Sequence, residues 1–314
     1  MTATSSAALE STGPGSNVAH STSNVSAHVA VRTRCAAGRS MNEDAVYLGD
    51  RQGTSWTVVE APDSGVVAAV LEGRWIAAVV DGMGGHKAGG RAAREVVQGL
   101  ATLGDPTRAS VTERLRELSV LLAALGRADT ALAGSGAAVT GLAHGSEGTF
   151  VFHVGDARAY RVRHAFLTQL TRDDSVAQAV ADAGAQDASQ PPWRVGRQLL
   201  QAIGGGTAAG EMSVHVQRVD VREPVRLLLC TDGLTDTLEI EVLERVVVGH
   251  ARDAVCVALV DAALAAESQD DVTALVVDLA PAVPGARATS SVTGAGEAVH
   301  GLEPFPLRPG GPHE

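Results

Sequence analysis

The chain has 314 residues, of which 45% are hydrophobic and only 3% aromatic, so a large core would be built from Val, Leu, Ala and Ile. The formal net charge of −11 and the lack of a Lys/Arg-rich run argue against binding to nucleic acid or to anionic membranes. Residues 1–26 do not have the pattern of a signal peptide, and no apolar run reaches the ~18 residues of a membrane span. These features predict a cytoplasmic protein.

The two ends of the chain differ in composition from its centre. Residues 1–26 are rich in Ser, Thr, Ala and Asn, and residues 281–314 have a similar character, so both ends are predicted to be disordered. Residues 27–280 form one continuous stretch without a linker or an internal repeat. The three cysteines have no metal-binding spacing and are interpreted as small apolar residues in a reducing compartment.

Strand patterns are frequent along this central stretch. Segments 66–73 and 74–82 flank Gly73 and predict a hairpin. The other segments with strand patterns are 26–34, 45–50, 136–145, 147–163, 213–221, 226–231 and 272–279.

Helix patterns are fewer and longer. They cover 88–103, a segment starting at Ser110 with the capping box Ser110-Val111-Thr112-Glu113, and then 175–183, 193–202, 235–248 and 253–266. Because strands and helices do not alternate regularly, the pattern favours an α+β fold with antiparallel sheets and helices on their outer faces.

Acidic residues repeatedly stand where an apolar strand begins or ends. Asp81 ends "WIAAVVDG", Asp156 ends "FVFHVGD" and Asp232 follows "RLLLC", while the pairs Glu43-Asp44 and Asp270-Asp271 precede strands. Each could simply cap a turn. Together they would repel one another in a buried site, and a hard cation, Mg²⁺ or Mn²⁺, would resolve that repulsion.

The glycines Gly82, Gly84 and Gly85 in "VVDGMGGH" would let the backbone approach a metal or a phosphate, and the carbonyl of Gly82 could itself be a ligand. The sequence has neither a P-loop nor a dinucleotide-binding glycine pattern.

The motifs, taken in order, resemble the metal-dependent serine/threonine protein phosphatases of type 2C in their compact bacterial form. The resemblance covers roughly residues 27–279 and rests on "RSMNEDA", "AAVVDGMGGHKAGGRAA", "FHVGDARAYRV", "LTRDDSV", "LLLCTDGLTD" and "SQDDVTALVV". It implies a four-layer α-β-β-α sandwich with residues 27–280 as the catalytic domain. It also implies two Mn²⁺ or Mg²⁺ ions, with a weaker third, and hydrolysis of phosphoserine and phosphothreonine by a hydroxide that bridges two metals.

The resemblance assigns a role to individual residues. Arg39 would bind the phosphate, and Asp81 would bridge both metals. Asp232 and Asp270 would complete one metal site, and the carbonyl of Gly82, with Glu43 and Asp44 acting mainly through water, would build the other. Asp156, with Asp232 and Asp236, would form the third site.

Several positions depart from the family pattern. Met83 stands where some members have the histidine proposed as the acid for the leaving alcohol, so His86 could serve as that acid or could stabilise the turn. Asp174 stands where many relatives have His, and Asp271 stands where Asn is usual. Segment 183–206 falls where the family has a variable flap, which would either select substrates or be an ordinary surface excursion.

The resemblance implies phosphoproteins as substrates and a bacterial Ser/Thr kinase as the enzyme opposed. The expected state is a monomer, because no strongly apolar amphipathic surface helix stands out. Two other interpretations stay open. One is a catalytically silent pseudophosphatase that acts as a binding module, and the other is a two-metal hydrolase of other phosphoesters.

Overall fold

The computed structural model describes residues 25–51, 55–59, 61–85, 87–184, 198–207, 212–281 and 292–293. Most of the two ends predicted to be disordered therefore lies outside the described residues. Within the C-terminal end, Val292–Thr293 forms strand β14, which pairs with β4 (Val67–Leu71).

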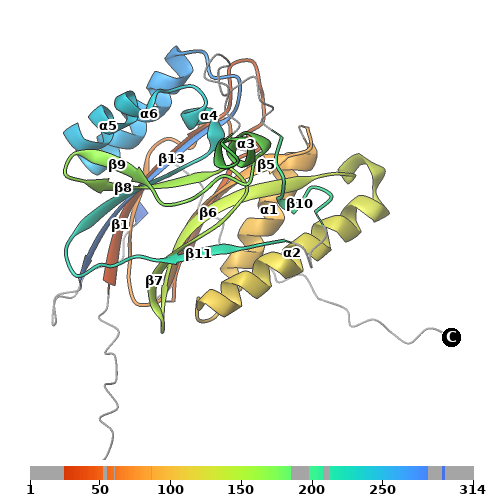
Figure 1. The fold of residues 1–314 in the computed structure, drawn as a ribbon, viewed down its shortest axis with the longest axis horizontal. Coiled ribbons are helices and arrows are strands. Elements are labelled where there is room, and N and C mark those ends of the chain that lie inside the picture. Colours follow the sequence, from red (N-terminus) through yellow and green to blue (C-terminus); the bar gives the residue numbers. More distant parts are fainter. Residues whose placement is uncertain are drawn as a thin grey trace, which may run out of the picture.

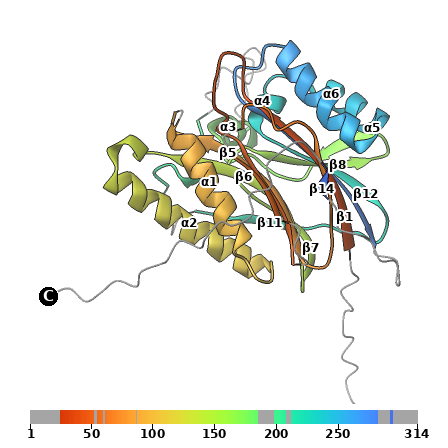
Figure 2. The ribbon, with the colours of Figure 1, turned by 180° about the vertical axis from the view of Figure 1, so that it is seen from behind.

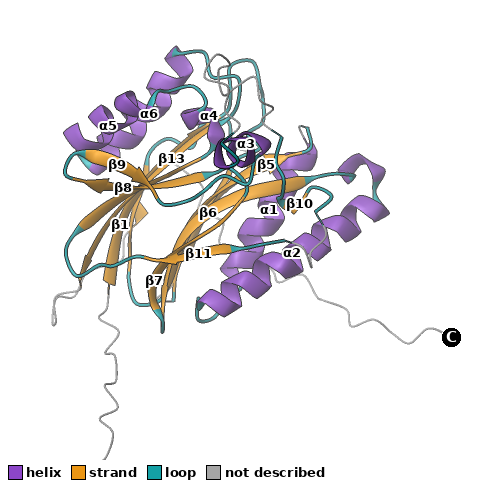
Figure 3. Cartoon of the chain, in the orientation of Figure 1, coloured by secondary structure: helices purple, strands orange, loops and turns teal. Residues whose placement is uncertain are grey.

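Two antiparallel sheets form the centre of the molecule (Figure 3). The first sheet has the order β14-β4-β1-β13-β12-β8-β9. Its remaining strands are β1 (Val25–Arg34), β8 (Arg158–Arg163), β9 (Phe166–Gln169), β12 (Val225–Cys230) and β13 (Val272–Pro281). The second sheet has the order β11-β7-β6-β5-β2-β3, with β10 paired to β6. Its strands are β2 (Ala45–Asp50), β3 (Ser55–Val59), β5 (Trp75–Met83), β6 (Gly136–Gly145), β7 (Gly148–Val154), β10 (Ile203–Gly204) and β11 (His215–Arg218).

Helices cover the outer face of each sheet (Figures 1 and 2). α1 (Lys87–Ala101) and α2 (Arg108–Ala128) pack on the second sheet, and the short helix η1 (Thr130–Leu132) follows α2. α5 (Ile240–Gly249) and α6 (Arg252–Ala265) pack on the first sheet. The short helices α3 (Val176–Asp182) and α4 (Asp232–Thr235) complete the set among the described residues. The expected α-β-β-α sandwich is confirmed.

The strand patterns explain the layers. In β1 the side chains of Val29 and Val31 face the second sheet and join a core between the sheets, whereas Ala30 packs toward the helices α5 and α6. In β5 successive residues are buried on both sides, because Val79 faces the first sheet and Val80 faces α1 and α2. A strand covered on both faces is a continuous apolar run, which is the pattern of "WIAAVV".

The hairpin predicted around Gly73 is wrong. Gly73 does make a turn with a positive φ of 66°. However, β4 pairs with β1 in the first sheet, and β5 pairs with β2 and β6 in the second. The turn therefore carries the chain across the sandwich. Segment 147–163 crosses in the same way, because β7 lies in the second sheet and β8 in the first.

Three helix predictions need correction. The N-cap of α2 is Thr107, whose side chain accepts from the backbone N–H of Ser110, so the capping box lies one turn before the predicted one. The helix predicted at 235–248 begins only at Ile240, because Glu239 before it has an extended backbone, and Thr235 instead ends the short helix α4. Residues 198–202 are not helical, because Leu200 donates its N–H to the carbonyl of Asp174 instead. Residues 193–197 lie outside the described residues.

Candidate active site

A cavity of about 870 Å³ opens at the end of the sandwich where β5, β7 and β12 terminate and β13 begins. Its wall contains acidic side chains from both sheets, one arginine and several glycines. The lining residues that the sequence predicted are Arg39, Glu43, Asp81, Gly82, Asp156, Asp232 and Asp270. Because antiparallel strands of both sheets end at this edge, residues far apart in the chain meet here.

The carboxylates in this wall repel one another, and burial together with this repulsion raises the pKa of two of them. Burial, followed by the charge of Asp232, raises the pKa of Asp81 well above its ordinary value, and the charges of Asp44, Asp156 and Asp270 add to this. Burial, followed by the charge of Asp232, also raises the pKa of Asp156 to about 8. Without a counter-charge, Asp156 therefore keeps its proton at neutral pH.

Arg39 is the cation nearest to these acids among the residues lining the cavity. Its guanidinium Nη1 lies 2.8 Å from Asp270 Oδ1, 3.3 Å from Asp271 Oδ2 and 3.8 Å from Glu43 Oε2. Burial alone would lower the pKa of Arg39, but the charges of these three carboxylates raise it. With 31% of its side chain exposed, Arg39 can also reach an anion in the cavity.

Asp44 joins the two sheets behind the cavity. It precedes β2 of the second sheet, and its Oδ2 accepts hydrogen bonds from Thr231 (2.8 Å) and Thr273 (2.6 Å), which belong to the first sheet. Burial and the charge of Asp271 raise the pKa of Asp44 well above its ordinary value, although both hydroxyls act in the opposite direction. The sequence did not predict the two threonines, because "CTDG" and "DVTAL" give no sign that their hydroxyls meet.

Gly82 is a position where only glycine fits. A Cβ there would lie 2.3 Å from the carbonyl oxygen of Gly89 in α1 and 2.6 Å from that of Glu43. Gly84 and Gly85 follow at the exposed rim of the cavity with φ of 121° and 81°, which side chains disfavour. The glycines thus bring α1 close to β5 and leave the rim at positions 84 and 85 without side chains.

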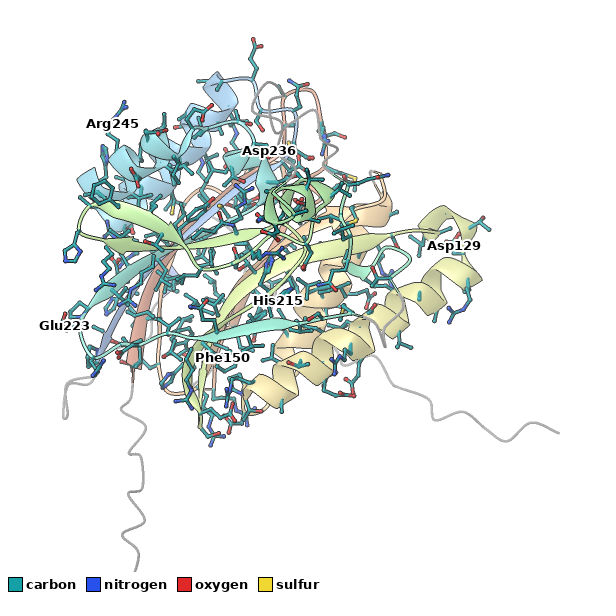
Figure 4. The ribbon with its side chains drawn as sticks, in the orientation of Figure 1. Asp129, Phe150, His215, Glu223, Asp236 and Arg245 are labelled. Carbon is teal, nitrogen blue, oxygen red and sulfur yellow. The ribbon has the colours of Figure 1, made fainter. Side chains whose placement is uncertain are left out.

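A buried ion pair supports the segment that carries Asp156. Arg158 binds Asp173 through Nε (3.0 Å) and Nη2 (2.6 Å), and the side chain of Asp173 is only 8% exposed. Asp174 beside it accepts the N–H of Gly155 at 2.9 Å and pairs with His215 Nε2 at 2.9 Å. Figure 4 labels His215, which lies on β11. The sequence flagged "LTRDDSV" without predicting these contacts.

Three predicted residues do not line the cavity or cannot be placed. His86 lies outside the described residues. Asp44 is bonded behind the cavity wall, as described above. Asp236, labelled in Figure 4, is exposed at the end of α4, and its charge contributes to the raised pKa of Asp156. Leu199, Leu200 and Gln201 also line the cavity, within the segment predicted to be a flap, most of which is not described.

Within the described part of the chain, no three His, Cys, Asp or Glu side chains stand together as a finished metal site. The chemistry of the wall nevertheless suits a hard divalent cation, because its donors are carboxylate and carbonyl oxygens that repel one another. The cysteines do not compete for a softer metal, since Cys230 and Cys256 are buried in the core and Cys35 donates to the carbonyl of Arg39.

Comparison with known proteins decides the family. Residues 61–253, more than half of the chain, match the protein phosphatase 2C family. The chain belongs to the protein phosphatase 2C family.

Two bacterial phosphatases are similar to this chain in sequence. The chain is 28% identical over 250 residues to the serine/threonine protein phosphatase PstP of Mycobacterium tuberculosis, which covers 77% of this chain and 43% of PstP. The chain thus spans less than half the length of that relative. It is also 28% identical over 186 residues to the serine/threonine phosphatase stp of Listeria monocytogenes, covering 55% of this chain and 72% of stp.

Solved structures support the same fold. The crystal structure of M. tuberculosis PstP matches with a TM-score of 0.64 at 26% identity, covering 81% of this chain and 99% of that one. A structure of the PstP catalytic domain with two manganese ions matches equally well at 25% identity, covering 82% of this chain and 99% of that one. As for membranes, no described helix has the length and apolar character needed to cross a bilayer.

Proposed function

We propose that this phosphatase 2C family member is a metal-dependent protein phosphatase that hydrolyses phosphoserine and phosphothreonine. The observation that carries the proposal is the convergence of Asp81, Asp156, Asp232 and Asp270 with Arg39 around one cavity. Burial and neighbouring carboxylates raise the pKa of Asp81 and of Asp156, so this wall suits bound cations, and the arginine beside it suits a phosphate. The manganese ions in the related PstP structure support the same interpretation.

For the metal-holding residues we propose the roles that the family resemblance implies. Asp81, Asp232, Asp270 and the carbonyl of Gly82 would hold two Mn²⁺ or Mg²⁺ ions, with Glu43 and Asp44 acting through water. Asp156 and Asp236 would serve a weaker third site. When bound, such ions lower the pKa of a water molecule that attacks phosphorus and neutralise the developing charge.

The chain's own groups supply binding and orientation. The guanidinium of Arg39 would exchange part of its contact with Asp270 for a forked contact with two phosphate oxygens. The exposed rim at Gly84 and Gly85 leaves room for the peptide that carries the phosphate. Leu200, which also lines the cavity, is 58% exposed and would contact that peptide through an apolar surface. His86 remains a prediction for the proton donor to the leaving alcohol.

The proposal also covers the substrates, the opposing enzyme, the location and the oligomeric state. We propose phosphoproteins as substrates, an opposing bacterial Ser/Thr kinase, a cytoplasmic location and a monomer. The acidic balance of the chain supports the exclusion of nucleic acid as a substrate.

The decisive experiment is phosphate release from a phosphothreonine peptide while Mn²⁺ is titrated and then chelated. We expect release that rises with Mn²⁺ and stops with the chelator, and that is lost in Asp81→Asn. If folded protein releases no phosphate at any Mn²⁺ or Mg²⁺ concentration, the proposal is wrong and a silent binding module replaces it.

A further inference from the structure

Asp271 is a buried carboxylate whose oxygens contact the loop between β1 and β2. It precedes β13, and its side chain is only 1% exposed. Its Oδ1 accepts the backbone N–H of Ala36 at 2.9 Å, and its Oδ2 accepts that of Glu43 at 2.7 Å. These two residues lie near the start and the end of the loop that connects β1 to β2, so one side chain ties both ends of the loop.

The loop between these two points carries Arg39. Asp271 Oδ2 lies 3.3 Å from Arg39 Nη1, so the carboxylate also contacts the guanidinium directly. Asp270 approaches the same Nη1 at 2.8 Å and accepts the N–H of Asp271 at 2.9 Å. The two consecutive aspartates therefore hold both the loop and the charged end of Arg39.

Asp271 itself cannot shift easily. A Cβ on Gly233, next to Asp232 in α4, would lie only 2.0 Å from the carbonyl oxygen of Asp271. The backbones at the start of α4 and the start of β13 are thus in close contact. A fixed backbone gives the Asp271 carboxylate a fixed position from which to hold the loop.

We propose that Asp271 is a positioning residue for the phosphate-binding arginine, and this rests on the proposed function of the cavity. A carboxylate suits the position, because each of its oxygens accepts one backbone N–H and the charge is satisfied by Arg39. The asparagine usual in the family would present an NH₂ group to one of the two N–H donors. This chain therefore uses Asp271 to fix the loop and to set the direction of Arg39.

The test compares Asp271→Asn with Asp278→Asn in the full chain. Asp278 is a matched control, because it lies at the other end of β13 and is paired with Arg226 at 2.7 Å. KM and kcat for the phosphothreonine peptide, and the inhibition constant of inorganic phosphate, are measured at saturating Mn²⁺. We expect Asp271→Asn to raise KM and the phosphate inhibition constant roughly three- to tenfold with little change in kcat, as the loss of about one hydrogen bond implies. Asp278→Asn should change neither.

A double-mutant cycle separates positioning from a general effect on the fold. If Asp271 acts through Arg39, adding Asp271→Asn to Arg39→Ala should raise KM by less than about twofold further. An equal effect in both backgrounds would overturn the proposal, and so would a loss of kcat at constant KM. Should Asp271→Asn fail to fold, Asp271→Glu, which keeps the charge but moves both oxygens by one methylene, replaces it in the cycle with the same expected results.

A readout without metal or turnover keeps this inference distinct from the proposed function. Amide hydrogen exchange at Ala36 and Glu43 in metal-free protein should accelerate in Asp271→Asn and stay unchanged in Asp278→Asn. Unchanged exchange at both amides would show that Asp271 does not hold the loop. If the wild type releases no phosphate but exchange is still accelerated in Asp271→Asn, the phosphatase assignment is wrong while Asp271 still holds the loop.

Discussion

Asp81 and Asp232 come from opposite sheets, yet the charge of Asp232 is the strongest single charge that raises the pKa of Asp81. Asp81 lies near the end of β5, and Asp232 begins α4 just after β12. Two acids brought together in this way destabilise a chain that holds no cation. The same arrangement is the one that a divalent metal would stabilise.

Asp232→Asn should therefore change stability and activity in opposite directions. Removing this charge relieves the repulsion on Asp81 and Asp156, so the Tm of the metal-free protein is expected to rise. Metal-dependent phosphate release should fall to background, and the gain in Tm on adding Mn²⁺ should shrink. Calorimetry with and without Mn²⁺, beside the peptide assay, measures both. A variant with near-normal turnover would show that Asp232 is not part of the site.

The contribution of Asp156 to the stability of the metal-free protein should fall as pH rises from about 4 to about 8. Asp156 has a folded-state pKa of about 8, whereas an unfolded aspartate titrates near 4. Across this window the folded state holds more protons than the unfolded state, so a rise in pH favours unfolding. The raised pKa values of Asp81 and Asp44 act in the same direction.

Thermal midpoints from pH 5 to pH 9 in a chelating buffer measure this slope. Asp156→Asn should show a smaller fall, and Mn²⁺ should reduce the fall in the wild type, because a bound cation favours the charged carboxylates. Identical slopes for wild type and Asp156→Asn would contradict the prediction.

Gly82→Ala should unfold at a much lower denaturant concentration than the wild type. The added Cβ would lie 2.3 Å and 2.6 Å from two backbone oxygens, neither of which belongs to a flexible side chain. Such overpacking is expected to cost about 1–3 kcal/mol in the free energy of unfolding. The control is Gly104→Ala, whose Cβ would meet nothing within 4 Å. Equal urea midpoints for the two variants would show that β5 and α1 separate more easily than their contact suggests.

Asp173→Ala should destabilise the chain strongly, because it leaves the half-buried Arg158 without its carboxylate. Breaking a buried ion pair from one side costs about 3 kcal/mol or more. Asp220→Ala makes the same change in a pair with Arg222 whose side chains are 50% and 88% exposed, and its urea midpoint should stay near that of the wild type. Comparable losses in both variants would mean that the Arg158 pair contributes no more than a surface contact.

The sequence predicted much of the site because the signal is local. Asp81, Asp156 and Asp232 each follow an apolar strand, and antiparallel strands that end together must bring such residues together. The sequence did not reveal the strand that pairs with β4. Gly73 makes the turn that its residue type predicts, but the choice between pairing β4 with β5 or with β1 depends on distant residues.

The polar contacts behind the site were beyond prediction for a related reason. Thr231 and Thr273 meet Asp44 across more than 180 residues of chain, and no spacing in the sequence encodes that meeting. The sequence marks Asp271 as one of the acids that precede a strand and as a departure from the family pattern. Its role at the loop becomes visible only in the structure, where its two oxygens accept the N–H groups of Ala36 and Glu43.

The bonds from Asp44 to Thr231 and Thr273 also bear on how the two sheets stay aligned. The core between the sheets is mostly Val, Leu and Ala, and such a surface resists separation much more than sliding. Hydrogen bonds are directional, so two of them from a single carboxylate oppose shear at the end of the sandwich where the acids gather. These bonds therefore hold the two sheets in register at the end where the cavity opens.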